Sequence, residues 1–133
     1  MKFNEARDEM LSLVDNLLDC KIVWPDTAEV VPSSEEAWAR VTINHVTGGQ
    51  ASLGSFDSAR RWDRSGILII QIFTPMGDGN SMAYDLAQTL VDGLQLKREG
   101  CVTLRNVTLN EVGASGAFYQ MNVTCTFSYD DIR

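Results

Sequence analysis

The feature that most constrains the fold is residues 66–75, with the sequence GILIIQIFTP. Apolar side chains fill both of its alternating sets, whereas a strand with one face in water would alternate apolar and polar residues. We therefore expect a central strand that is covered on both faces. It should end at Pro75, which has no backbone N–H to donate. A central strand requires neighbours on both sides, so the chain should build a sheet.

The remaining segments divide into helical and extended patterns. Helices are expected where apolar residues recur every three or four positions, and strands where they alternate. The expected helices are 3–18 and 81–96, and the expected strands are 38–46, 66–75, 102–109 and 119–128, with a turn at 113–116 and an irregularity at Asn106. This order, αββαββ, predicts an α+β fold in which a four-stranded, mostly antiparallel sheet packs both helices on one face.

Length and charge limit the classes of protein that remain. With 133 residues, of which 44% are hydrophobic, the chain predicts one domain, 1–133. We expect no membrane partner, because the longest apolar run is far short of about 20 residues. No basic, apolar leader opens the sequence, so a cytosolic protein is expected. The net charge of −7 disfavours sequence-specific contact with nucleic acid.

The side chains that usually carry catalysis are sparse. His45 is the only histidine, and Cys20, Cys101 and Cys125 lie far apart in the sequence. That spacing matches neither a zinc site nor a disulfide framework. No nucleophile elbow or phosphate-binding glycine motif is present. We therefore expect a protein that is not an enzyme and has no metal, cofactor or disulfide.

One segment is a candidate for a functional surface. Residues 47–65 are rich in glycine, serine and arginine, and such a length predicts a long, flexible, basic loop. It lies within residues 37–66, a local island of positive charge in an acidic chain, and its arginines and aromatic residues are typical of a binding surface. Trp62 could equally fold back onto its own sheet. The candidate subunit or tube interface comprises Arg40, Phe56, Arg60, Arg61, Trp62 and Arg64.

Several segments, taken in order, resemble the phage tail terminator-like proteins. The central part of this resemblance is residues 64–79, RSGILIIQIFTPMGDG, followed by Ala83 and by Leu86-Ala87. Further matching segments are Phe3 with Ala6-Arg7, WARVTI at 38–43, SLG at 52–54, YQMNV at 119–123 and FSYD at 127–130. Together they extend over nearly the whole chain.

The resemblance implies a structural virion protein at the head-proximal end of the phage tail, assembled in the host cytoplasm. Proteins of this family form a ring, a homohexamer, that caps the tail tube and ends its polymerisation. The implied partners are further copies of the chain, the tail-tube protein and a head completion or neck protein. The family supplies no catalytic or binding residues to transfer to this sequence.

Other functions fit part of the pattern. A different head–tail joining protein of the virion, such as a head completion or neck protein, has the same requirements. A small RNA-binding domain is a further alternative, although the outward residues of 119–128 are not aromatic and the chain is acidic. An enzyme subunit or a ligand-binding domain is the third.

Overall fold

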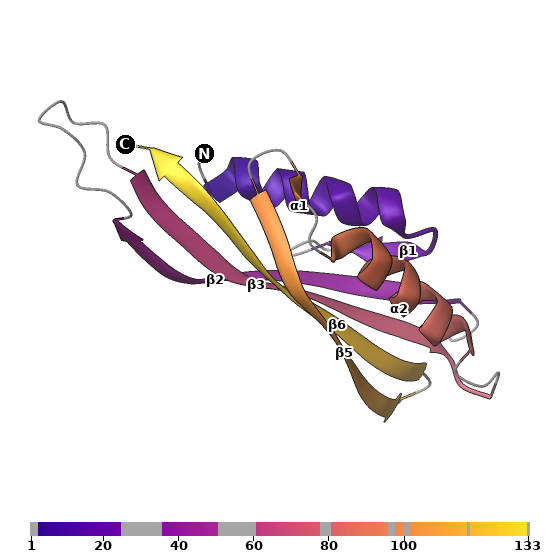
Figure 1. Cartoon of the computed structure of the whole chain (residues 1–133). Coiled ribbons are helices and arrows are strands. Elements are labelled where there is room, and N and C mark those ends of the chain that lie inside the picture. The colour runs from indigo at the N-terminus through magenta and orange to yellow at the C-terminus, as the bar shows by residue number, and fades with distance from the viewer. Residues whose placement is uncertain are drawn as a thin grey trace, which may run out of the picture.

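The computed structural model describes residues 3–24, 36–50, 61–77, 81–95, 98–99, 102–116 and 118–132. Within them the chain forms two helices and a six-stranded sheet (Figure 1). The elements are α1 (Phe3–Leu17), β1 (Lys21–Val23), β2 (Trp38–Gln50), β3 (Arg61–Pro75), α2 (Ser81–Leu94), β4 (Arg98–Glu99), β5 (Val102–Ser115) and β6 (Phe118–Ile132).

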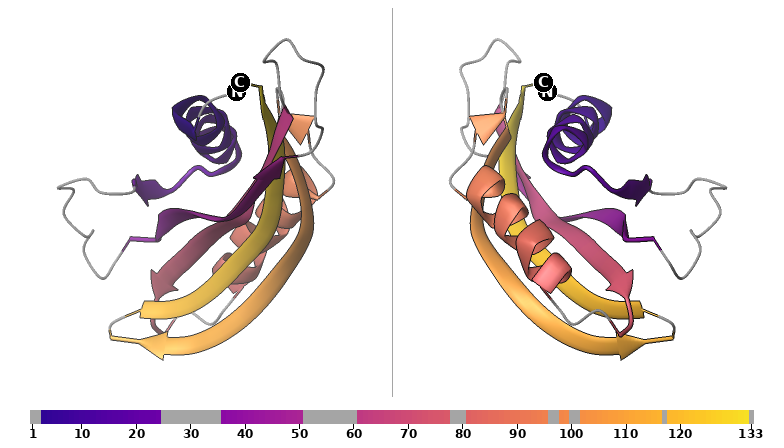
Figure 2. Two further views of the ribbon diagram at one scale, coloured as in Figure 1. Left: turned by 90° about the vertical axis from the view of Figure 1, so that its left-hand side faces the viewer. Right: turned by 90° about the vertical axis from the view of Figure 1, so that its right-hand side faces the viewer.

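The strands lie in the order β1-β2-β3-β6-β5-β4, and the sheet is twisted and curved (Figure 2). The β1–β2 pair is parallel and all other pairs are antiparallel. The α+β class is as expected, and the long elements follow the predicted αββαββ order. The predicted number of four strands is wrong. Two strands of three and two residues were missed because so short a segment has no measurable alternation.

One face of the sheet and both helices build the main core. Every second residue of β3 and β6 is buried against the helices, including Leu68, Ile70, Val123 and Phe127. The register places Leu68 opposite Cys125 and Ile70 opposite Val123, so the buried side chains form continuous rows. The alternation seen in residues 119–128 therefore marks the core side of β6, as predicted.

The two helices contact each other as well as the sheet. Their buried residues recur at three- and four-residue spacings: Ala6, Met10, Leu13 and Val14 in α1, and Ala83, Ala87, Leu90 and Leu94 in α2. Gly93 allows the close approach, because a Cβ there would lie 2.4 Å from a methyl group of Leu17. A larger residue at position 93 would push α1 away from α2.

Two long strands are interrupted by bulges. The register of β2 shifts between His45 and Thr47, and that of β5 shifts between Arg105 and Thr108. Asn106, within the second shift, has a φ of 56°, a conformation that asparagine tolerates better than most residues. This confirms the irregularity expected at Asn106.

The predicted loop at 47–65 has the wrong bounds. Residues 47–50 belong to β2 and residues 61–65 to β3, and the two segments pair with each other. Strand pairing overrides the weak strand propensity of glycine and serine there, because β3 is also held by β6 on its other side. Residues 51–60, and with them the predicted flexibility, lie outside the described residues.

Candidate interaction surface

The sheet has one face that neither helix covers, and we call it the helix-free face (Figure 1). Its members alternate with the buried core residues along each strand. Among the described side chains they are Lys21, Val23, Trp38, Arg40, Thr42, Asn44, Ser65, Ile67, Ile69, Gln71, Phe73, Thr103, Arg105, Thr108, Asn110, Phe118, Gln120, Asn122, Thr124, Thr126 and Ser128. Threonine and amide side chains dominate its centre.

Cross-strand hydrogen bonds order the polar part of this face. The hydroxyl groups of Thr108 and Thr124 are hydrogen-bonded at 2.7 Å. The Arg105 guanidinium donates a hydrogen bond of 3.4 Å to the Ser128 hydroxyl. Pairs of this kind stabilise neighbouring strands by roughly 0.2–1 kcal/mol each. The polar part of this face is therefore ordered by side-chain hydrogen bonds between neighbouring strands.

An aromatic cluster occupies one end of the helix-free face. The rings of Trp38 and Phe73 are stacked 4.2 Å apart, and Phe118 meets both of them edge-on. The Arg40 guanidinium lies 5.3 Å from the Trp38 ring centre and 6.0 Å from that of Phe73. Trp38 and Phe73 are buried, at 3% and 6% exposure, so Arg40 is the exposed member of the stack.

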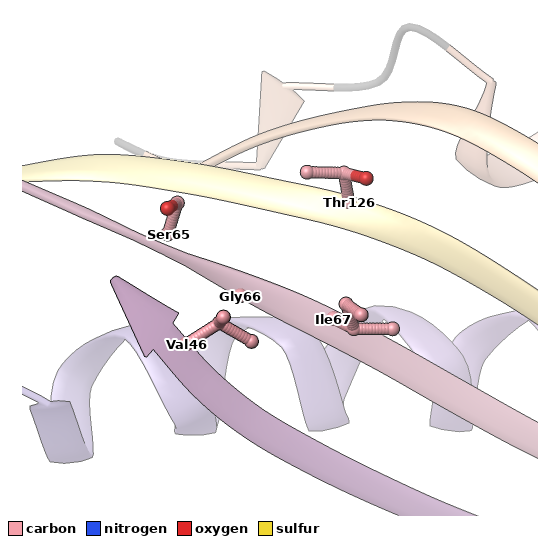
Figure 3. Close-up of a pocket in the computed structure, with 5 residues that line it drawn as sticks. All are labelled: Val46, Ser65, Gly66, Ile67 and Thr126. Atoms are coloured by element: carbon pink, nitrogen blue, oxygen red, sulfur yellow. The ribbon is translucent and has the colours of Figure 1, made fainter. Parts of the chain in front are cut away.

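A shallow apolar depression of about 200 Å³ lies toward the other end (Figure 3). It is lined by Val46, Ser65, Gly66, Ile67 and Thr126. Val46 and Ile67 are 62% and 40% exposed, which is high for branched aliphatic residues. The prediction that β3 is covered on both faces is therefore wrong at Ile67. The depression is therefore a small apolar area on a largely polar face.

Charge is separated between the two sides of the sheet. The helix-free face carries Lys21, Arg40 and Arg105, and among its described side chains it has no carboxylate. The opposite side, which we call the helix side, consists of α1, α2 and the core-facing residues of the strands. It carries the carboxylates of Glu5, Asp8, Glu9, Asp15, Asp85, Asp92 and Glu111. Its described cations are Arg7, which pairs with Asp8 at 3.1 Å, and Arg64.

The helix side also holds a ring cluster at the start of α1. Phe3 packs edge-on against His45 at 4.8 Å, and the Arg64 guanidinium lies 5.2 Å from the Phe3 ring centre. His45 Nε2 and the Tyr129 hydroxyl are hydrogen-bonded at 2.7 Å. Burial lowers the pKa of His45, and the nearby charge of Arg64 lowers it further. This cluster ties α1 to β2, β3 and β6.

The structure does not gather the candidate interface residues into one island. Arg40 lies on the helix-free face and Arg64 on the helix side. Arg61 and Trp62 belong to β3, but their side chains are outside the description, as are Phe56 and Arg60 altogether. Sequence analysis missed Lys21, Arg105 and Ile67. For Arg105 a signal existed, because it alternates with the apolar Val102 and Leu104 along its strand. For Ile67 there was none, because apolar residues fill both alternating sets of residues 66–75.

The described thiols are poor nucleophiles. Burial raises the pKa of Cys125 to about 12, and burial is also the main cause that raises the pKa of Cys20. Among the described residues, no three His, Cys, Asp or Glu side chains come close enough to hold a metal ion. Within the same residues, neither helix has the length and apolar character needed to span a bilayer.

Comparisons with known proteins give the fold and nothing finer. No family model matches the chain, and no curated protein matches it. Among solved structures, 23 chains are similar. One of them has a TM-score of 0.61 at 13% identity, with 92% of this chain and 94% of that chain covered, and its name states no function. At this identity the similarity establishes a shared α+β fold alone.

Proposed function

We propose that this protein is a structural component of a phage virion that caps the tail tube as a ring. The ring, a homohexamer by the family resemblance, ends tube polymerisation and offers the surface on which a head completion or neck protein docks. The sequence resemblance supplies the class. The structural observation that carries the proposal is the separation of charge between two opposite surfaces of one small fold.

A ring requires two different surfaces on each subunit, because head-to-tail contacts join one patch to another. The helix-free face and the helix side differ in charge, in secondary structure and in shape. In the described side chains neither surface is self-complementary in charge, which disfavours a two-fold dimer in which a patch meets its own copy. The polarity of the molecule thus supports a cyclic arrangement.

The alternative hypothesis is that the sheet surface binds RNA, and the aromatic cluster argues against it. Single-stranded RNA is read by bases that stack on exposed aromatic rings. Trp38 and Phe73 lie on the sheet face, where such rings would be needed, yet both are buried. Arg40 covers the stack. A base would first have to displace this guanidinium.

The test is the mass of the native protein with and without purified tail tubes, followed by electron microscopy of gold-labelled protein. We expect rings, alone or on tubes, and label at one end of each tube only. Tubes polymerised in the presence of the protein should stop growing. Label on isolated heads would instead indicate a head completion or neck protein, and a monomer that ignores tubes would refute the proposal.

A further inference from the structure

We infer that neighbouring copies of this chain associate through the helix-free face of one copy and the acidic helix side of the next. This inference rests on the proposed function and identifies the two surfaces that would meet. The occupant of the helix-free face is accordingly a second copy of the chain.

Charge complementarity is the first argument. Lys21 and Arg105 stand at opposite margins of the helix-free face, on β1 and β5, with Arg40 between them on β2. All three are exposed. The helix side presents exposed carboxylates on both helices, among them Asp15 and Asp92. Such opposed surfaces attract one another and disfavour like-with-like contact, which sets the orientation of the partners.

Apolar groups are available on both surfaces to provide affinity. On the helix-free face, Val46 and Ile67 border the depression (Figure 3). On the helix side, Tyr84 and Leu109 are 40% and 39% exposed. The Tyr84 hydroxyl donates a hydrogen bond to the Glu111 carboxylate, which holds its ring over β5. Partly exposed aromatic and aliphatic anchors within a polar surface are the usual composition of an interface.

The area of the helix-free face is sufficient. Its four long strands have 13 to 15 residues each. At about 3.3 Å per residue and about 4.8 Å between strands, they cover about 900 Å². A stable interface buries about 800 Å² on each partner. The face therefore matches one subunit contact in size.

The experiment uses two double variants with opposite charge changes. Lys21→Glu/Arg105→Glu makes the helix-free face acidic, and Asp15→Lys/Asp92→Lys makes the helix side basic. Each variant alone would present two surfaces of like charge. Mixed at equal amounts, the reversed helix-free face of one variant meets the reversed helix side of the other, and the native pairs meet as well.

We expect each variant alone to need at least a tenfold higher protein concentration than the native chain to associate. The equimolar mixture should regain assembly, with equal numbers of both variants in each particle by native mass spectrometry. The charge-preserving chain Lys21→Arg/Arg105→Lys is the matched control, because it alters the same two exposed side chains and keeps their charge. It should associate like the native chain. Circular dichroism verifies that all variants are folded.

The outcomes separate this inference from the proposed function. Native-like rings formed by either charge-reversed variant would contradict the assignment of the two contact surfaces and would leave the proposed tail-capping function standing. The same holds if the mixture fails to assemble, or if the charge-preserving Lys21→Arg/Arg105→Lys is as defective as Lys21→Glu/Arg105→Glu. A native chain that stays monomeric, both alone and with tail tubes, would overturn the function and this inference together.

Discussion

Arg40 and Arg64, carried by adjacent strands, lie on opposite faces of the sheet. Arg40 covers the Trp38 and Phe73 rings of the helix-free face, whereas Arg64 covers Phe3 at the start of α1. Pairing places Arg40 opposite Gln71. Gln71 is seven residues beyond Arg64 on β3, or about 23 Å along the strand. Two arginines of one expected patch therefore have separate roles.

Replacing Phe3 by alanine should loosen the start of α1. The variant loses the ring contact with His45 and the cation–π contact with Arg64, so we expect a loss of about 1 kcal/mol in the free energy of unfolding. Met82→Ala is a matched control, since both side chains are 49% exposed. Thermal unfolding and amide exchange in α1 measure the effect. Equal losses in both variants would show that the Phe3 contacts contribute nothing specific.

Gly66→Ala should destabilise the sheet. A Cβ at this position would lie 2.0 Å from the Asn44 carbonyl oxygen and 2.7 Å from the Phe127 ring, so strand β2 would have to shift. Overpacking of this kind costs about 1–3 kcal/mol or more. Gly116→Asn is the control, because φ is 62° and the surrounding space is open. Urea unfolding that is unchanged in Gly66→Ala would contradict the close β2–β3 contact.

His45 should make stability depend on pH below its ordinary pKa of 6.5. Burial lowers the pKa of His45 in the folded chain, so the unfolded chain binds a proton more readily. This contribution to stability is complete above pH 6.5 and declines as the pH falls through that value. His45→Gln removes the titrating group and can keep a hydrogen bond to Tyr129.

The measurement is denaturant unfolding of both chains between about pH 7 and about pH 5.5, where most carboxylates stay ionised. The native chain should lose more stability over this range than His45→Gln. Parallel pH profiles for the two chains would assign the acid sensitivity to other groups.

Cys125 should resist alkylation in the folded protein. Its thiol is 2% exposed and its pKa is raised to about 12, so little thiolate forms at neutral pH and reagent has little access. Cys20 is half-buried and should react faster than Cys125. Iodoacetamide labelling, mapped by peptide mass, compares the two in buffer and in urea. Labelling of Cys125 in buffer at its rate in urea would show that the β6 core side is open.

The long, strongly patterned elements could be predicted from the sequence. The helices and the four long strands were found because three- to four-residue spacing and alternation report burial directly. The charged surface could not be found in this way. Arg40, Lys21 and Arg105 lie on one face only through the order β1-β2-β3-β6-β5, and that order is set by long-range pairing. The expected basic island instead grouped arginines that are close in sequence. The β2–β3 pairing places these arginines on two different faces of the sheet.

The bulges in β2 and β5 have a consequence for the two margins of the sheet. In the described residues, β1 pairs with only the first three positions of β2, and β4 with only the first two of β5. Within these residues, long stretches of β2 and β5 have no strand partner on their outer side, which leaves N–H and C=O groups that can template the addition of foreign strands. The kinks at Val46 and Asn106 break that template into short pieces. We therefore expect the two bulges to limit amyloid-like strand addition at both margins.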